Sequence, residues 1–281
     1  MGRKVRRGRR NGDGAGRAGV WAVGGVFTAV AFVAAGALGA AQPRTGIPEE
    51  VVQLTQFGPA LAVGAVAVFR RRRTRELLRD AAATAAGARP LGGALLLGAA
   101  GLIVALSVLG CYAVGGEAGF TPPGSLHHSF ALIAVAQLVG ACGEEVGWRC
   151  FLQPLLRTRL GVLASSVTVG VLWGAWHVPV FAQAPAYAAG FLVATTAMSV
   201  LLGIALDGVG GWRRLLLAGG FHTLVNLGLL LFLDEESGAV PPMLCFGLSC
   251  LVVAASAAAP GAGRRAPEPA AAPGPTTLHG T

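Results

Sequence analysis

Residues 128–152 read HSFALIAVAQLVGACGEEVGWRCFL, and this stretch decides the fold class. It is largely apolar and, at about 20 residues or more, long enough to cross a bilayer as a helix. Glu144, Glu145 and Arg149 nevertheless lie inside it. Ionisable groups at that depth cost roughly 2.5–3.5 kcal/mol each on insertion scales, so they usually mark function. The stretch therefore predicts a membrane-spanning helix that carries a functional site.

Seven other stretches have the same apolar character. They are predicted to span the membrane at residues 18–41, 51–69, 91–115, 161–182, 188–206, 215–233 and 241–259. The composition agrees, since 54% of the residues are hydrophobic and only 12% are charged. Gly and Ala are abundant in these stretches, and small residues let helices pack closely in a membrane. The sequence thus predicts an all-α fold, a polytopic membrane helix bundle of about eight transmembrane helices.

The loops between the predicted spans differ in charge between the two sides of the membrane. One set is basic and contains Arg70–Arg73, Arg75, Arg79, Arg89, Arg157, Arg159, Arg213 and Arg214. The other set has one basic residue, Arg44, beside the acidic residues Glu49, Glu50, Glu117, Asp234, Glu235 and Glu236. Because basic loops are retained in the cytoplasm, we expect a multi-pass protein of the cell membrane with both termini cytoplasmic.

The net charge of +9 follows from the same loops and from a basic N-terminus. Basic segments beside apolar helices contact anionic lipid headgroups, so we expect the bilayer, and no nucleic acid, as their partner. The five cysteines are odd in number, contain no CxxC pair and lie within or at the edge of apolar stretches. They are expected to be packing residues and not a disulfide framework.

The predicted spans divide the chain into five segments. These are a basic tail expected to be disordered (1–18), helices one to three with a basic loop at 70–90 (19–127), a core of helices four to seven (128–235), helix eight (236–259) and a disordered Pro/Ala-rich tail (260–281). The first span resembles a signal peptide, but its apolar run of about 22 residues exceeds the usual 7–15. This length favours an uncleaved helix.

The first polar cluster contains two adjacent carboxylates. On a helix Glu145 and Arg149 are i,i+4 neighbours and can pair, which offsets much of the burial cost of both. Glu144 points about 100° away around the helix and has no such local partner. Adjacent carboxylates in different surroundings acquire different proton affinities, so Glu144 is the candidate for a proton-accepting role. The alternative is a Glu–Arg clamp that only holds two helices together.

The second and third clusters each place a histidine in an apolar stretch. His177 follows Trp173 by one helical turn, and Pro179 is expected to weaken the helix close to it. His222 and Asn226 form an i,i+4 pair on another span. Taken singly, each has a structural alternative, which is helix packing for His177 and an interhelical hydrogen-bonding pair for His222 and Asn226.

Together the clusters indicate hydrolysis. A water held by the imidazoles of His177 and His222, directly or through a metal, could lose a proton to Glu144. Asn226 could then donate to the oxyanion of a tetrahedral intermediate. For upright helices with the predicted bounds, Glu144 and His222 lie roughly 12 Å from the cytoplasmic edge but His177 roughly 24 Å. A single site therefore requires helix tilt or a later start of the fifth span.

The three motifs, EExxxR, aromatic-xxx-His and HxxxN, occur in this order on separate helices and resemble those of the CPBP family. That family comprises CAAX-type prenyl-protein endopeptidases and bacteriocin-processing or Abi-type proteins. The resemblance covers residues 128–235. One departure is Trp173, which stands where the family commonly has Phe.

The resemblance implies a role for each motif residue. It implies Glu144 as the water-activating base, supported by Glu145 and Arg149, and Asn226 as the group that polarises the scissile carbonyl. His177 and His222 would bind the water or a metal. The sequence lacks the HExxH spacing of a typical zinc site. Two mechanisms therefore stay open, one with Zn²⁺ or another divalent metal held by His177, His222 and Glu144, and one without a metal.

The function predicted from these observations is that of an intramembrane endopeptidase. It would hydrolyse a peptide bond in a membrane-associated protein or peptide. One alternative is a non-catalytic membrane binding protein of the Abi or bacteriocin-immunity type, and another is a transporter of an ion or small molecule.

Overall fold

The computed structural model describes residues 7–69, 72, 92–115, 119–233 and 238–259, with side chains from residue 19 onward. Every regular element in these ranges is helical, and none is a strand. The α-helices are α1 (Arg7–Thr45), α3 (Gly93–Ala113), α4 (Phe130–Gly147), α5 (Gln153–Arg157), α6 (Val162–Trp176), α7 (Pro185–Ala205), α8 (Gly211–Phe232) and α9 (Val240–Ala258). A further apolar helix spans Leu54–Phe69 and begins with the 3-10 turn η1 (Leu54–Phe57). The predicted all-α bundle is confirmed.

Each of the eight predicted spans coincides with an apolar helix. In the part of the chain that is described, six helices are long and apolar enough to cross a membrane. The helix Leu54–Phe69 and α6 are apolar but shorter. The chain is therefore a multi-pass membrane protein.

The helix that carries the two carboxylates is longer than predicted. After α4 the chain continues through the π-helical turn η3 (Trp148–Leu152) into α5, so the helix ends at Arg157 and not at residue 152. Pro154 lies in the first turn of α5 and has no N–H to donate to the preceding turn. A wide turn at this point, often found at functional sites, keeps the helix continuous.

In contrast, α6 is shorter than predicted and ends at Trp176 instead of residue 182. His177 leaves the helical region with φ −77° and ψ 63°. Pro179 follows in the 3-10 turn η4 (Val178–Ala182), and a proline there cannot continue the hydrogen-bond ladder of the helix. The weakening expected near His177 is thus a complete helix end.

At the N-terminus, α1 begins at Arg7, within the tail that was expected to be disordered to residue 18. Its apolar part includes Gly19–Thr45 and so extends past residue 41, where the predicted span ends. No proline interrupts the helix before Pro43 in its last turn, so a helix nucleated in the apolar part can propagate backward. Residues 1–6, most of the basic loop 70–90 and the tail 260–281 lie outside the described residues.

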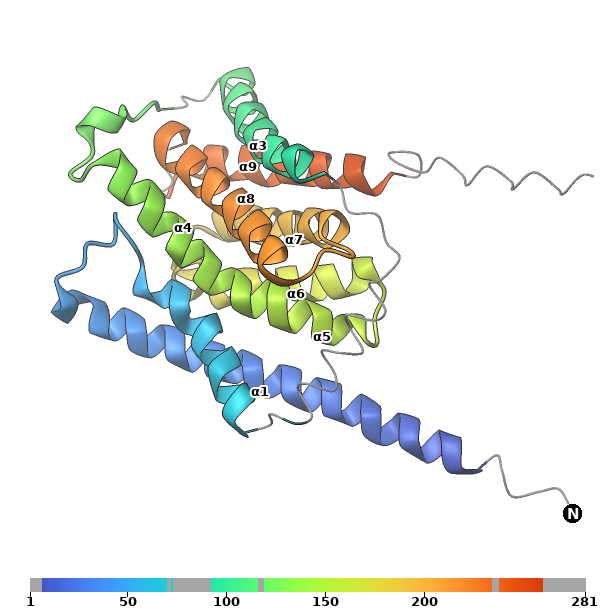
Figure 1. Ribbon diagram of the computed structural model, residues 1–281. Helices are drawn as coiled ribbons and strands as arrows, with labels where there is room; N and C mark the ends of the chain where they lie inside the picture. The colour runs from blue at the N-terminus through green and yellow to red at the C-terminus, as the bar shows by residue number, and fades with distance from the viewer. Residues whose placement is uncertain (1–6, 70–71, 73–91, 116–118, 234–237, 260–281) are drawn as a thin grey trace, which may run out of the picture.

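Figure 1 shows α4 running through the bundle, with α1 and the helix Leu54–Phe69 on one side of it and α8 on the other. The helix α7 packs against both α6 and α9, and α3 packs against α8 and α9. Glycines permit the closest approaches to α4. A Cβ on Gly147 would meet Pro59 and Phe27, and a Cβ on Gly219 of α8 would meet Cys142 Sγ at 2.5 Å. The face of α4 that carries Glu145 can therefore lie close to α8.

Contacts between loops agree with the predicted alternation of sides. Glu50, between α1 and η1, accepts a hydrogen bond from the His127 N–H at 3.1 Å and lies 3.2 Å from His128 Nδ1. Partial burial raises the pKa of Glu50. The hydrogen bonds to His128 and His127 lower it by more, so the pKa of Glu50 lies below its ordinary value. At the opposite ends of the helices, Arg157 pairs with Asp207 at 3.0 Å. In these two cases, loops that were predicted to share a side lie together.

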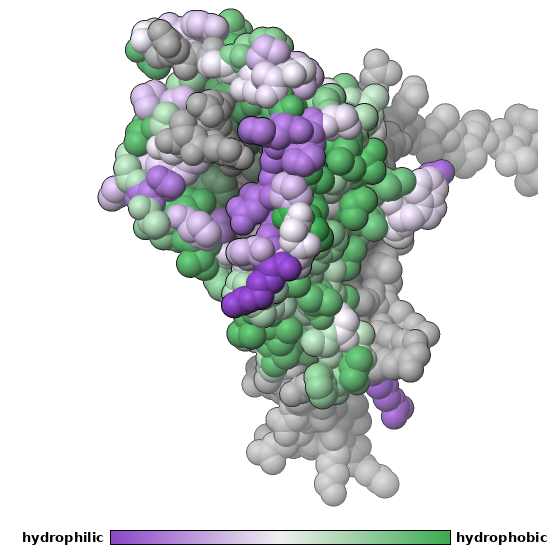
Figure 2. Space-filling model, turned by 90° about the vertical axis from the view of Figure 1, so that its left-hand side faces the viewer, coloured by the Kyte–Doolittle hydropathy of each residue, from purple (hydrophilic) through white to green (hydrophobic). Residues whose placement is uncertain are grey.

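Figure 2 views the side of the molecule on which the chain turns after α1 and enters α4. Hydrophilic residues gather there in a narrow band, with apolar surface around it. Large apolar side chains are exposed on most of the helices, as on α3, where Leu95 is 65% exposed. Such an apolar surface is favourable in contact with lipid and unfavourable in contact with water.

Candidate active site

Trp173 and Glu144 form the centre of the polar cluster. The indole Nε1–H of Trp173, on α6, donates to Oε2 of Glu144, on α4, over 2.7 Å. Both side chains are 2% exposed. A buried carboxylate is costly unless its oxygens accept hydrogen bonds, and this bond satisfies one of the two oxygens of Glu144.

Glu145 faces a different set of partners. Its Oε2 lies 3.3 Å from Nε of Arg149, and its Oε1 lies 3.1 Å from Nδ1 of His222 on α8. All three residues are at most 5% exposed. The i,i+4 pair predicted from the sequence is therefore present, and His222 extends it across to a second helix. Because a carboxylate can only accept, Nδ1 of His222 carries the proton in this contact.

Arg149 is held mainly by charge and by an aromatic ring. It is completely buried, and its Cζ lies 4.6 Å from the ring centroid of Trp173, within cation–π range. The contact with Glu145 is close enough for an ion pair but does not have the geometry of a hydrogen bond. Among the described residues, Nε, Nη1 and Nη2 of Arg149 have no hydrogen-bond partner. The buried charge of Arg149 is therefore stabilised by Glu145 and by the ring of Trp173, and by no hydrogen bond from the described residues.

His177 reaches the cluster through the end of α6. Its Nδ1 lies 2.9 Å from the backbone carbonyl oxygen of Trp173. A carbonyl oxygen only accepts, so Nδ1 carries the proton and Nε2 keeps its lone pair. The ring also lies edge-on to Trp176 and Phe191, each with centroids 4.9 Å apart. His177 is partly exposed, and its free nitrogen is thus the one available to a water or a substrate.

Asn226 lies one turn after His222 on α8, and it is partly exposed. Its Nδ2 donates to Oε1 of Gln137, on α4, over 3.3 Å. Nothing in the motifs singled out Gln137. A signal was available, since Gln137 precedes Glu144 by seven residues, or two helical turns, and therefore lies on the same face of α4.

The depths of the site residues agree better than the sequence predicted. Depths can be counted at ~1.5 Å per residue from the observed helix ends on the side predicted to be cytoplasmic, which are Arg157, Gly211 and Val162. On this count Glu144, His222 and His177 lie roughly 20, 17 and 22 Å deep. The earlier mismatch arose because the helix of Glu144 continues to Arg157 and because α8 begins at Gly211 and not at residue 215. The contacts join the cluster around Trp173, whose ring centroid lies 5.1 Å from that of His222 and 6.0 Å from that of His177.

The fit of a metal to this cluster can be tested by its donor set. Across the described residues, no group of three or more His, Cys, Asp or Glu side chains is arranged to hold a metal ion. His177, His222 and Glu144 therefore do not form a three-ligand site in this conformation. The divalent metal stays a prediction, and we derive no step of the reaction through it.

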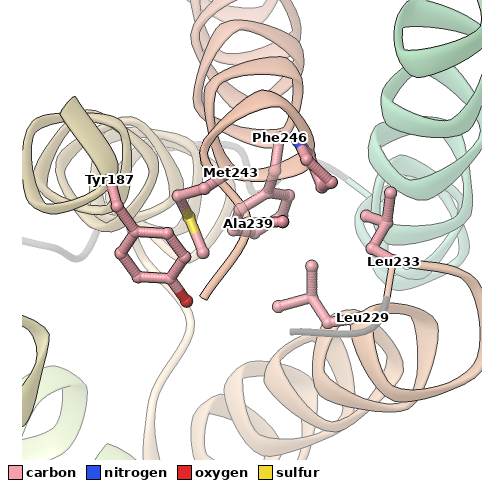
Figure 3. A pocket seen from close by; sticks show the side chains of 7 residues that line it. Tyr187, Leu229, Leu233, Ala239, Met243 and Phe246 are labelled. Carbon is pink, nitrogen blue, oxygen red and sulfur yellow. The ribbon is translucent and has the colours of Figure 1, made fainter. Parts of the chain in front are cut away.

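Two hollows in the described part of the bundle lie away from the polar cluster. One is a cavity of about 10 Å³, close to the volume that one water needs, between α7, α8 and α9. Figure 3 shows its lining, with the Tyr187 ring and Met243 facing Leu229 and Leu233 across it. The other is an open apolar groove of about 520 Å³ between α6, α7 and α9. Neither is lined by a predicted site residue.

Comparison with known proteins gives matches to the same region. The family model described as Type II CAAX prenyl endopeptidase Rce1-like matches residues 126–228, which include all six predicted site residues. The chain is 24% identical over 166 residues to the "CAAX prenyl protease 2" of Methanococcus maripaludis, a match that covers 54% of this chain and 60% of that protein.

Two staphylococcal proteins are also similar to this chain. It is 26% identical over 128 residues to the "Lysostaphin resistance protein A" of Staphylococcus epidermidis, and 25% identical over 122 residues to the protein of that name from Staphylococcus aureus. These matches cover 46% and 43% of this chain but only 33% and 29% of the relatives. The chain thus matches about a third to three fifths of the length of these relatives. The matches confirm the resemblance to the CPBP family.

Proposed function

We propose that this chain is an intramembrane endopeptidase in which Glu144 activates the attacking water. One observation carries the proposal. Glu145 is engaged by a cation and an imidazole, whereas Glu144 accepts a bond from the neutral indole of Trp173 and, among the ion pairs of the described residues, takes part in none. Glu144 therefore keeps one oxygen that can accept a proton, which is what a general base requires.

The reaction can be written with the groups of this chain alone. A water near Nε2 of His177 and His222 attacks the carbonyl carbon of the scissile bond while Glu144 takes its proton. The carbonyl oxygen becomes an oxyanion, to which the amide of Asn226 donates. Glu144 then passes the proton to the amide nitrogen as the C–N bond breaks, which releases an amine and a carboxylic acid. Glu145 and Arg149 hold the helices of these groups together.

We propose a membrane-associated protein or peptide as the substrate, because the site lies deep within the apolar helices. The bilayer is the second partner, with anionic headgroups at the basic loops. The corresponding location is the cell membrane, with both termini in the cytoplasm. The name of the methanococcal relative, a CAAX prenyl protease, makes a prenylated C-terminal peptide a useful probe beside an unmodified one.

The first test compares protein termini in membranes from cells that express the wild type or Glu144→Gln at matched levels. We expect new termini with the wild type only, and they identify the substrates. Glu49→Gln, at an exposed carboxylate in the loop after α1, is the matched control and should keep every terminus. Identical termini in the wild type and Glu144→Gln would remove Glu144 as the base.

The second test uses purified protein in lipid nanodiscs. An internally quenched peptide that spans an identified cleavage site is supplied in unmodified and farnesylated forms. Faster cleavage of the unmodified form supports the proposed substrate class, and cleavage of the farnesylated form alone assigns the chain a prenylated substrate instead.

A binding function without catalysis has one observation in its favour. The Arg149–Glu145–His222 network joins α4 to α8 and would serve equally as a clamp in a protein of the Abi or immunity type. The name of the staphylococcal relatives describes resistance and not cleavage. This alternative predicts that Glu144→Gln keeps the biological effect of the wild type, while Arg149→Met loses it.

A further inference from the structure

Trp173 contacts four of the six predicted site residues, although no role had been predicted for it. Its indole N–H bonds Glu144, its carbonyl oxygen accepts from His177, its ring lies edge-on to His222, and Arg149 lies over its face. A ring alone could supply the last two contacts. Only an indole, among the aromatic side chains without an ionisable group, can also donate the hydrogen bond to Glu144.

The hydrogen bond to Glu144 has geometric consequences. A carboxylate can rotate about its last side-chain bond, so either oxygen could face the substrate. With Oε2 fixed at 2.7 Å from the indole nitrogen, rotation is restricted and Oε1 is left as the oxygen that can accept a proton. Since the donor is neutral, it orients the carboxylate without the charge neutralisation that Arg149 gives Glu145.

The main-chain contact of the same residue orients a second site group. His177 donates from Nδ1 to the Trp173 carbonyl oxygen, which fixes its tautomer. This carbonyl would be bonded by residue 177 in a continuing α-helix, and it is open to the imidazole because α6 ends at Trp176. One residue thus orients a carboxylate with its side chain and an imidazole with its backbone.

We propose that Trp173 is a positioning residue, which holds Glu144 so that Oε1 receives the proton of the attacking water. This proposal rests on the proposed peptidase function. Its distinguishing prediction is that the indole N–H matters beyond the presence of a ring.

The kinetic test replaces Trp173 with Phe and with 3-benzothienylalanine, which keeps the bicyclic ring but has sulfur in place of N–H. Hydrogen bonds to charged groups contribute enough for an expected loss of about 10- to 100-fold in kcat for both variants, with KM little changed. A loss confined to kcat in variants that remain folded is a result that a merely structural role would not give.

Trp176 supplies the matched control. It lies in the same helix, is 6% exposed, and its indole donates to the carbonyl oxygen of Ala31 over 3.2 Å, away from the carboxylates. The benzothienylalanine variant at Trp176 loses an indole hydrogen bond of the same kind. We expect less than a threefold change in kcat. Thermal unfolding of each variant verifies that it is folded.

A spectroscopic readout tests the hydrogen bond without catalysis. In ¹⁵N-indole-labelled protein in nanodiscs, the Trp173 Nε1–H resonance is assigned by its absence from Trp173→Phe. Glu144→Gln should shift that resonance upfield, because an amide oxygen is a weaker acceptor than a carboxylate, and should leave the other four indole signals in place.

The outcomes separate the two proposals. A wild type that cleaves nothing overturns the proposed function and, with it, the role of Trp173. A wild type that cleaves, beside Trp173 variants that are equally fast, overturns only the role of Trp173. An indole resonance that does not move in Glu144→Gln shows that the hydrogen bond is absent, and this result also overturns the role of Trp173. A shifted resonance together with slow, folded variants supports the proposal.

Discussion

Arg149→Met is expected to be among the most destabilising single substitutions in this protein. The side chain is 0% exposed, and within the described part of the chain it forms an ion pair with Glu145, which is also 0% exposed, at 3.3 Å. At an effective dielectric constant of about 20, two unit charges at that separation attract by about 5 kcal/mol. Burying each ion costs several kcal/mol, so the pair contributes little net stability. Removing one partner, however, leaves the other charge unpaired and should cost about 3–5 kcal/mol.

The same reasoning predicts that a second substitution restores stability. Glu145→Gln removes the unpaired charge and keeps an oxygen for the Nδ1–H of His222. The double variant Glu145→Gln/Arg149→Met should therefore be more stable than Arg149→Met alone, by about 2–3 kcal/mol. Arg213→Met is the control, since Arg213 is exposed and its substitution should change stability by less than about 1 kcal/mol.

Reversible unfolding in mixed micelles, followed by tryptophan fluorescence, measures these differences. The four species of the double-mutant cycle give the coupling energy directly. If Glu145→Gln destabilises Arg149→Met further, or adds to it independently, the two residues do not neutralise each other and the clamp is not an ion pair.

Three further predictions follow from single contacts. Gly219→Leu should separate α8 from α4 at Cys142, break the contact between His222 and Glu145 and abolish cleavage. Gly220→Leu is the control: a side chain there would meet only Leu97, at 3.4 Å, and the variant should keep at least a tenth of the activity. Equal activities of the two variants would contradict this prediction. Gln137→Leu should lower kcat about 3- to 10-fold by releasing Asn226, on the basis of one neutral hydrogen bond, and an unchanged kcat would show that Asn226 needs no support. The lowered pKa of Glu50 means that its contacts stabilise the fold fully above its ordinary value of 4.5 and are lost as pH falls through the lowered value. The difference in melting temperature between the wild type and Glu50→Gln should accordingly be present at pH 6 and vanish near pH 3.

Metal dependence is open to a direct test. Since His177, His222 and Glu144 do not form a three-ligand site, we expect dialysis of the purified protein against 1,10-phenanthroline to leave cleavage unchanged. Loss of cleavage that Zn²⁺ restores would instead support the metal mechanism, and would mean that these side chains rearrange around the ion.

Much of the bundle could be predicted because its signals are local. Each span is a run of apolar residues, and the Glu145–Arg149 contact follows from helical spacing alone. The ends of the spans were less predictable. Arg157 is a basic residue in a helix that continues past an apolar run, and Pro154 is tolerated because a π-helical turn precedes it. Neither effect is visible in hydropathy.

The contacts across helices could not be predicted from spacing. The sequence indicates that Glu144 has no partner on its own helix but does not indicate that the indole of Trp173, on another helix, fills that position. Likewise, Gln137 looks like an isolated polar residue until α8 brings Asn226 beside it. Such pairs depend on how the helices cross, and small residues such as Gly219 set that crossing through close packing that charge patterns do not report.

The two adjacent carboxylates illustrate why a site of this kind needs both neutral and charged partners. Both oxygens of Glu145 are engaged, one by the buried cation Arg149 and one by His222. Moving Glu145 toward a substrate would leave that buried cation without its partner. Glu144 is instead oriented at one oxygen by a neutral donor, the indole of Trp173. In the proposed mechanism this neutral contact leaves Glu144 for the reaction, while the charged contacts of Glu145 serve the structure.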